Sequence, residues 1–97
     1  MSKYITNLFL ATKVSFFNDM YSVCESLEVD FNSSMSAVML DPRIGKSHNQ
    51  VPGPDGDRGY GGHCFPKDMS AILHLADKRE IRVPTLVGAD LTNRLNR

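Results

Sequence analysis

The sequence predicts an all-α domain, and three observations support that prediction. Residues 3–29 contain neither glycine nor proline, and their apolar residues recur at helical spacing. Two later segments begin at Pro66 and Pro84, a residue type favoured in the first turn of a helix. The stretch Ile81-Arg82-Val83 is too short to found a sheet. With 97 residues, we expect one domain over residues 1–97.

The helix predicted over residues 3–29 carries two apolar stripes. One stripe comprises Ile5, Phe9, Thr12, Phe16, Met20, Val23 and Leu27, and the other comprises Leu10, Val14, Phe17, Tyr21 and Cys24. A surface helix needs only one such stripe. At 1.5 Å per residue, the helix would be about 40 Å long, more than a chain of this size can wrap alone. We therefore expect one stripe, with Cys24, to pack within the domain and the other to pair with a second subunit. The pattern predicts a homodimer.

Three shorter helices and a long loop are expected after this helix. Asn32-Ser33-Ser34 is a plausible cap for a helix that runs to about Leu40 and stops at Asp41-Pro42. Residues 41–63 hold six of the seven glycines and three of the five prolines, which predicts a loop. The third helix is expected to start at about Pro66 and the fourth to run from Pro84 to about Leu95. The expected apolar contacts are Met69, Ile72, Leu73, Leu75 and Ala76 on the third helix, and Leu86, Val87, Leu91 and Leu95 on the fourth.

Composition narrows the classes of function. Eleven basic and eleven acidic residues give no net charge and form no basic stripe, so we expect no nucleic-acid or membrane partner. The start of the chain does not resemble a signal peptide, and the two cysteines are expected as reduced thiols of a cytoplasmic protein. The three histidines have no metal-ligand spacing with either cysteine, so no metal site is expected.

Reactive side chains are concentrated in residues 59–68, which read GYGGHCFPKD. Cys64 follows a flexible glycine turn and precedes a predicted helix, whose positive end favours thiolate over thiol. Asp68 lies one helical turn later, where its carboxylate could orient or deprotonate a water molecule. A cysteine in a small domain is more often a packing residue, and an acid in a first turn often only complements the helix dipole. Both interpretations of each residue remain open on the pattern alone.

A second candidate group lies at the start of the chain. Lys3 and Asn7 are four residues apart, so they project from one face of the first helix, and Asn18 returns to nearly the same face. An ammonium beside a carboxamide can stabilise a developing oxyanion. A solvated helix end is the plainer explanation of the same residues.

Four segments in this order carry a family resemblance: residues 3–11 (KYITNLFLA), 13–19 (KVSFFND), 41–45 (DPRIG) and 59–68. Together they resemble the central domain of the UDP-glucose 6-dehydrogenase (UDP-glucose/GDP-mannose dehydrogenase) family. The similarity covers roughly residues 3 to 92. It implies an NAD-dependent enzyme that oxidises C6 of a nucleotide sugar twice, from alcohol to carboxylate.

The resemblance also implies roles for individual residues. Cys64 takes the place of the nucleophile that captures the aldehyde as a thiohemiacetal. Lys3 and Asn7 match the residues that steady the oxyanions and the catalytic water, and Asp68 matches the acid acting with that water. Substrate binding is implied for Arg43, which would reach the neighbouring subunit's substrate, and for Tyr60, Gly61, Gly62 and Phe65. The family's central domain dimerises through a long helix.

The chain departs from the family in three ways. We expect no counterpart of the family's NAD-binding domain or C-terminal nucleotide-binding domain within these 97 residues, and hence no NAD on this chain alone and no dehydrogenase activity from it. The threonine and glutamate that the first domain contributes to the site are absent with it. Glu28 stands where the family usually has a glycine, so the first helix is expected to end less sharply.

Three functional hypotheses follow. The chain is the substrate-binding and dimerisation domain of a nucleotide-sugar 6-dehydrogenase, completed by an NAD-binding domain in cis or in trans. Alternatively, it is a non-catalytic helical module that pairs with itself or with a complete dehydrogenase. The third hypothesis is a plain helical domain with an accidental similarity. The identity of the sugar stays open, with UDP-glucose as the commonest member of the family.

Overall fold

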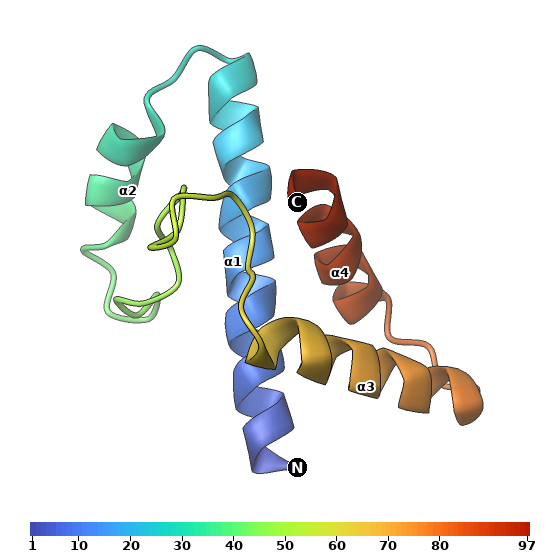
Figure 1. Ribbon diagram of the computed structural model, residues 1–97. Coiled ribbons are helices and arrows are strands. Elements are labelled where there is room, and N and C mark those ends of the chain that lie inside the picture. Colours follow the sequence, from blue (N-terminus) through green and yellow to red (C-terminus); the bar gives the residue numbers. More distant parts are fainter.

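The computed structural model describes residues 1–97 as four helices joined by loops, without a strand. The helices are α1 (Ser2–Ser26), α2 (Phe31–Val38), α3 (Cys64–Lys78) and α4 (Pro84–Asn96). Figure 1 shows α1 as a central column, with α2 and the long loop on one side and α3 and α4 on the other. The all-α prediction is confirmed. None of the helices is long and apolar enough to cross a membrane.

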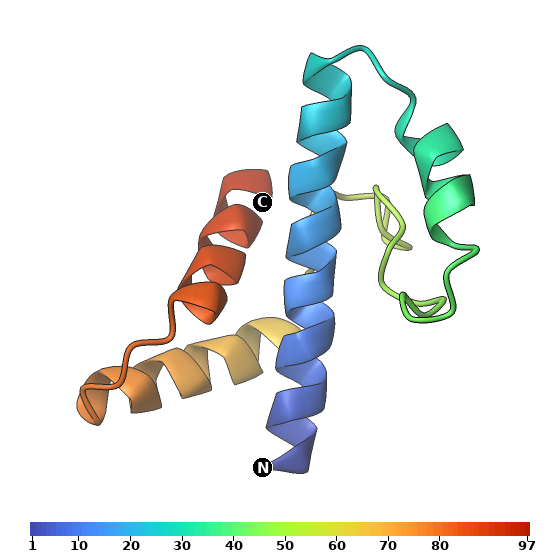
Figure 2. The same ribbon diagram turned by 180° about the vertical axis from the view of Figure 1, so that it is seen from behind.

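The other three helices all pack against α1, and the core forms at two levels along it. The first level is built from Leu8, Ala11, Tyr60, Met69 and Ala89. The second level is built from Phe17, Phe31 and Val51, with Tyr21 and Cys24 packed against it. The view from behind in Figure 2 shows α1 with α3 and α4 on one side and α2 with the long loop on the other. The stripe that contains Phe17 and Cys24 therefore packs within the chain, as expected.

The other stripe of α1 is exposed. Ile5, Phe9, Phe16, Met20, Val23 and Leu27 keep between 38% and 67% of their surface accessible. Burying apolar surface of this kind is worth about 25 cal/mol per Å². These six large apolar side chains form a face of α1 that no element of its own chain covers, and a contact that buried this face would be favourable.

The end of α1 is sharper than its sequence suggests. Glu28 adopts a left-handed conformation with φ of 56°, and its N–H bonds the carbonyl of Glu25 at 3.2 Å. The N–H of Val29 bonds the carbonyl of Cys24 at 2.8 Å. These two bonds form a Schellman motif, which usually has glycine in the left-handed position. The expectation that Glu28 would soften this end is wrong, because Glu28 itself takes the conformation of the glycine.

Two other helix starts differ from the expectation. Asp30 caps α2, since its Oδ2 accepts hydrogen bonds from the N–H and the hydroxyl of Ser33. The cap therefore lies two residues before the predicted Asn32-Ser33-Ser34. At the other helix, α3 begins at Cys64 rather than at Pro66, so the cysteine is the first helical residue instead of preceding the helix. Pro66 still lies in the first turn, where its missing N–H costs nothing.

Some apolar positions of α3 and α4 face outward instead of inward. On α3, Met69 and Ala76 are buried, whereas Leu75 is exposed. On α4 the buried position is Ala89, which was not predicted. Leu86 packs against the first core level, whereas the side chains of Val87, Leu91 and Leu95 are exposed, so the predicted register of α4 holds only at Leu86. The bounds of α4 itself agree with the prediction.

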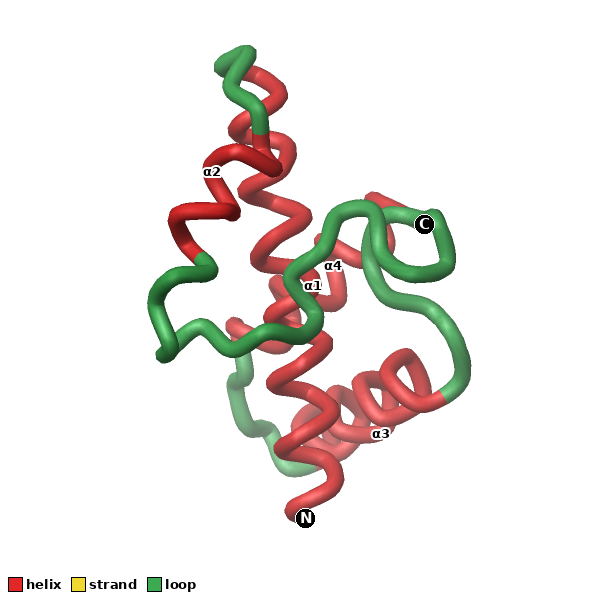
Figure 3. The backbone as a smooth tube through the Cα atoms, turned by 90° about the vertical axis from the view of Figure 1, so that its left-hand side faces the viewer, coloured by secondary structure: helices red, strands yellow, loops and turns green.

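Residues 41–63 form the long loop, as predicted. Figure 3 shows this segment returning from the end of α2, across α1, to the start of α3. Lys13 of α1 anchors its first part, since its ammonium donates a 2.7 Å hydrogen bond to the carbonyl of Ile44. The last part of the loop carries the glycines that lead into Cys64.

Candidate active site

One hydrogen bond joins α1 and α3 at the candidate catalytic residues. The amide Nδ2 of Asn7 donates to Oδ2 of Asp68 at 2.7 Å. Asp68 is 1% exposed, whereas the side chain of Asn7 is half-buried. Hydrogen bonds to a charged carboxylate contribute more than neutral ones, about 1.5–3 kcal/mol. The bond therefore fixes the relative position of the two helices at this point.

Cys64 and Lys3 lie one helical turn from that bond, on α3 and α1 respectively. Side chains four residues apart on a helix are neighbours on its surface, about 5–6 Å between Cβ atoms. The pairs Lys3–Asn7 and Cys64–Asp68 are thus brought to one junction of two helices. Both Cys64 and Lys3 are exposed. Cys64 is also the first residue of α3, where unpaired N–H groups and the helix dipole give partial positive charge.

The other carboxylate oxygen of Asp68, Oδ1, is buried and has no hydrogen-bond partner in the protein. A buried polar atom without a partner costs about 1–3 kcal/mol, so it is commonly satisfied by water or a ligand. Asp68 can therefore accept a hydrogen bond from a water molecule while it holds Asn7.

A separate pocket of about 530 Å³ lies at the glycine loop (residues 59–62), and none of the four candidate catalytic residues lines it. Phe65 forms part of its wall, with its ring 6.0 Å from the ring of Tyr60 and 5.6 Å from that of His48. The lining residues are Val14, Lys46 to Gln50, Gly53 to Asp55, Gly59 to Gly62, Phe65 and Arg97. Four of the residues expected to bind substrate, Tyr60, Gly61, Gly62 and Phe65, therefore share one pocket.

Tyr60 is the most buried side chain of this pocket. Burial, reinforced by the negative charge of Asp90, raises the pKa of Tyr60 from 10.0 to about 12. Its hydroxyl has no hydrogen-bond partner in the protein. Tyr60 is thus an uncharged wall residue at neutral pH, with a free hydroxyl.

Arg43 lies apart from the pocket. Its guanidinium pairs with Asp41 at 2.6 Å, and its side chain is 87% exposed. The hydrogen bond from Arg43 lowers the pKa of Asp41, so the pair stays charged. The structure of this chain does not bring Arg43 to the other candidate residues.

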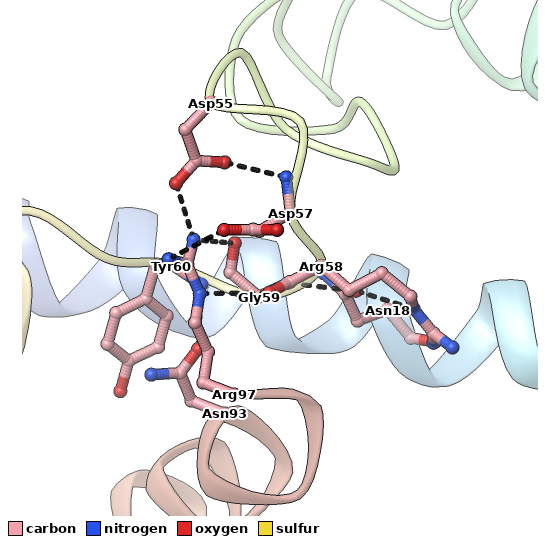
Figure 4. Close-up of polar contacts among 8 residues, drawn as sticks. All are labelled: Asn18, Asp55, Asp57, Arg58, Gly59, Tyr60, Asn93 and Arg97. Carbon is pink, nitrogen blue, oxygen red and sulfur yellow. Dashed lines mark hydrogen bonds and ion pairs between the residues drawn. The ribbon is translucent and has the colours of Figure 1, made fainter.

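Asn18 has a different place from the one its spacing suggested. It is buried three helical turns from Asn7, and its Oδ1 accepts hydrogen bonds from the N–H of Gly59 and from Nε of Arg58. Figure 4 shows this contact together with two others that sequence reasoning missed, from Asn93 and Arg97 of the chain's last turns. No motif marked these residues, because the contacts join positions 33 to 42 residues apart.

Groups that would hold a metal or a dinucleotide are not assembled by these residues. No three or more His, Cys, Asp or Glu side chains are placed to hold a metal ion. A dinucleotide fingerprint needs a strand that leads through glycines into a helix, and here a loop leads into α3.

The junction and the glycine loop fall within a sequence pattern shared with known proteins. The pattern of the UDP-glucose/GDP-mannose dehydrogenase family, central domain, matches residues 1–95. This chain belongs to that family. Within the UDP-glucose/GDP-mannose dehydrogenases, the part that it corresponds to is the central domain, which confirms the resemblance found in the sequence.

Individual members of the family are similar over most of the chain. UDP-glucose 6-dehydrogenase TuaD of Bacillus subtilis is 43% identical over 76 residues, 78% of this chain and 15% of that protein. UDP-glucose 6-dehydrogenase of Rickettsia prowazekii is 38% identical over 93 residues, 96% of this chain and 20% of that protein. The enzyme of that name from Pseudomonas aeruginosa is 42% identical over 78 residues, 80% of this chain and 16% of that protein. The chain thus spans about a fifth or less of the length of these relatives.

Proposed function

We propose that this chain is the substrate-binding and dimerisation domain of an NAD-dependent nucleotide-sugar 6-dehydrogenase, with Cys64 as its nucleophile. The observation that carries the proposal is the hydrogen bond between Asn7 and Asp68. It joins the two helices that bear Lys3 and Cys64, each one turn away from it. Four residues with complementary chemistry are thereby gathered from positions about 60 residues apart.

The proposed chemistry of Cys64 is addition to an aldehyde. Its thiolate sulfur attacks the carbonyl carbon, a C–S bond forms, and the carbonyl electron pair moves to oxygen. Protonation of that oxygen gives the thiohemiacetal. Cys64 suits this step because it is exposed and stands at the N-terminus of α3.

Lys3 and Asn7 would stabilise the oxygen on which negative charge develops. The carboxamide of Asn7 has two N–H groups, and one of them is used by Asp68. The other is available to an oxyanion, as is the exposed ammonium of Lys3. Loss of one such donor typically costs about 3 kcal/mol of barrier.

Asp68 is assigned to the water that would hydrolyse the later thioester. Its buried Oδ1 has no partner in the protein, so it can accept a hydrogen bond from that water. Its Oδ2 is held by Asn7, which fixes the carboxylate plane. Oδ2 of Asp68 thus holds α3 to α1, whereas Oδ1 is available to the water molecule.

In the family, NAD is the hydride acceptor. The residues of this chain form no strand and hence no dinucleotide fold, so they offer no hydride acceptor of their own. An NAD-binding domain in cis or in trans would have to supply it. What this chain contributes is the nucleophile, the donors around it and the pocket.

The proposed substrate is a nucleotide sugar, with UDP-glucose suggested by the names of the relatives. The pocket beside the glycine loop has the volume of a small-molecule site, which is about 300–1,000 Å³. No hydrogen bond of the protein uses the N–H of Gly61 or Gly62. Both amides are free to donate to a sugar or phosphate oxygen.

The exposed stripe of α1 supports the homodimer. Its six large apolar residues are the kind of surface that a helix-mediated dimer buries. An apolar groove of about 320 Å³ between α1 and α2 continues this surface through Phe16 and Met20. The outward position of Arg43 agrees with a residue that serves the neighbouring subunit's substrate.

The experiment that tests the catalytic assignment is protection of the thiols from alkylation. The purified chain is treated with iodoacetamide, with and without the C6 aldehyde of UDP-glucose, and each cysteine is quantified by mass spectrometry. We expect the aldehyde to slow alkylation of Cys64 and leave Cys24 unaffected. Unchanged alkylation of Cys64 at millimolar aldehyde would contradict the proposal. Glucose 6-aldehyde without the nucleotide is the matched control ligand.

A non-catalytic dimerisation module is the second candidate, and the exposed stripe of α1 is the observation that favours it. Such a module needs no reactive thiol. If Cys64 is alkylated no faster than a cysteine in a short peptide, while the chain is dimeric, this second function is the better one.

A further inference from the structure

The backbone of the glycine loop is held by side chains from two helices instead of by other backbone groups. The N–H of Gly59 donates to Oδ1 of Asn18, on α1, at 3.1 Å. The N–H of Tyr60 donates to Oδ1 of Asn93, on α4, at 2.7 Å. Figure 4 shows both carboxamides directed at two successive backbone amides.

The carbonyl side of the same segment is held by Arg97, the residue that follows α4. Nε of Arg97 donates to the carbonyl of Arg58 at 3.0 Å, and Nη2 reaches the carbonyl of Gly59 at 3.3 Å. Nη2 also donates to Asp55 at 2.7 Å, so Arg97 ties two parts of the loop together. From Arg58 to Tyr60, every backbone bond of the loop in Figure 4 is made to a side chain of α1, of α4 or of Arg97, which follows α4.

The two asparagines are themselves fixed. Asn18 is 1% exposed, and its Nδ2 donates to the carbonyl of Val14 at 2.9 Å, which sets the orientation of the carboxamide. Asn93 lies directly against Gly59, since an added Cβ at Gly59 would collide with its Oδ1. Gly59 has φ of +79°, a conformation that other residues rarely adopt. The loop therefore has one well-defined position at Gly59 and Tyr60.

The hydrogen bonds stop at Tyr60. Gly61 and Gly62 make none through their N–H groups, and Cys64 follows two residues later at the start of α3. Between the anchored Tyr60 and α3, this segment is held only by packing, with Gly61 against the guanidinium of Arg97. The position of Gly61 and Gly62 depends on Tyr60 at one end and on α3 at the other. Asn18 and Asn93 fix the end at Tyr60.

We propose that Asn93, together with Asn18, is a positioning residue of the proposed substrate site, which fixes the backbone at Gly59 and Tyr60 and so places Gly61 and Gly62 for the ligand. This inference rests on the proposed function for the identity of the ligand. Reacting and binding groups must be held within about 0.5 Å of their productive positions. Two glycines provide little stiffness of their own, so the stiffness comes from the anchored amide beside them.

The test compares Asn93→Leu with Asn93→Asp in the 97-residue chain. Leucine has a similar shape but no acceptor, whereas aspartate keeps an acceptor oxygen for the N–H of Tyr60. The matched control is Asn96→Leu, because Asn96 lies on the same helix and its side chain bonds only the carbonyl of Thr92. Circular dichroism checks that each variant remains helical.

Two measurements are made on each variant: amide ¹⁵N order parameters of Tyr60 and Gly61, and UDP-glucose affinity from amide chemical shifts. We expect Asn93→Leu to lower the order parameters from about 0.85 to below about 0.6 and to weaken binding at least tenfold. Asn93→Asp should keep the UDP-glucose affinity within about threefold, and the order parameters within about 0.1, of the values for the unmodified chain. Asn96→Leu should change neither measurement.

Each outcome decides the proposal. Unchanged order parameters in Asn93→Leu, or equal losses in Asn93→Leu and Asn93→Asp, would overturn it, since a packing role alone does not distinguish an acceptor from a methyl group. If the unmodified chain does not bind UDP-glucose, the proposed function loses its substrate. The order parameters then still decide whether Asn93 fixes the loop, so the two failures are distinguishable.

Discussion

Asn7 and Asp68 are 61 residues apart in the sequence and are joined by a 2.7 Å hydrogen bond between side chains. The carboxylate of Asp68 is fully buried, and the amide of Asn7 is its one protein partner. The bond connects the first turns of α1 with the first turns of α3. The folding of the chain and the assembly of the candidate active site therefore depend on the same contact.

Replacing Asp68 with alanine should destabilise the protein. The variant leaves the amide of Asn7 without its partner, and a hydrogen bond to a charged group contributes about 1.5–3 kcal/mol. We expect a loss in that range in urea unfolding. A double-mutant cycle with Asn7→Ala should give a coupling energy of at least about 1 kcal/mol. Additive effects of the two substitutions would show that the bond contributes nothing to folding.

Cys64→Ala should abolish activity when this chain replaces the central domain of a complete relative, because no other exposed thiol is present. NADH formation at 340 nm, with UDP-glucose and NAD as substrates, measures the effect. Cys24→Ala is the control and should keep most of the activity, since Cys24 packs against the second core level. The isolated chain should form no NADH, and NADH formed by purified chain alone would refute that expectation.

Phe9→Glu and Phe16→Glu should each convert the proposed dimer into monomer, since they place a charge in the exposed stripe of α1. Sedimentation equilibrium gives the mass of the particle in solution. Ile81→Glu is the matched control, because Ile81 is also exposed but lies between α3 and α4. A monomeric unmodified chain at 100 micromolar or above, roughly a weak-dimer Kd, would rule out the proposed homodimer.

Glu28→Gly should stabilise the protein. Glu28 has φ of 56°, and a left-handed conformation costs an ordinary residue about 1 kcal/mol more than it costs glycine. The larger entropy of glycine in the unfolded chain offsets part of this gain, so we expect about 0.5–1 kcal/mol in thermal or urea unfolding. Glu80 ends α3 in the same conformation, and Glu80→Gly should behave alike. Glu25→Gly, inside α1, should have the opposite sign.

Tyr60 should titrate late in alkali. Burial raises its pKa from 10.0 to about 12, so the folded state favours the neutral phenol. The stability that this provides is complete below pH 10 and is lost as the pH rises from 10 to about 12. Absorbance near 295 nm should therefore show a phenolate step close to pH 12 that is missing in Tyr60→Phe. A Tyr60→Phe titration identical to that of the unmodified chain would contradict the raised pKa.

Local patterns were sufficient to predict the helices. The absence of glycine and proline before Val29 and the proline at position 84 gave α1 and α4 close to their observed bounds. Backbone hydrogen bonds within a helix join residues four apart, so the information lies within a short window. The pairs Lys3–Asn7 and Cys64–Asp68 were visible for the same reason.

The contacts that hold the glycine loop could not be predicted from such local patterns. Asn93 bonds the N–H of Tyr60 across 33 residues, and nothing near Asn93 in the sequence indicates this partner. Asn18 was noted only for its spacing from Asn7, whereas its carboxamide faces Gly59. The outward direction of Leu91 and Leu95 could not be predicted from local sequence either. The residue of α4 that packs into the core against α1 is the small Ala89, and this is decided by how the two helices pack. Side-chain contacts over long sequence distances depend on how the helices pack.

If Arg43 serves a neighbouring subunit's substrate, as proposed, its ion pair with Asp41 makes that binding an exchange of one anion for another. In the protomer, the guanidinium of Arg43 is already neutralised by a carboxylate 2.6 Å away. A phosphate of a neighbouring subunit's ligand would have to displace that carboxylate, so its net gain is the difference between two anions competing for one cation. Because the Arg43 side chain is 87% exposed, water screens this pair, and the displacement costs an incoming phosphate oxygen little.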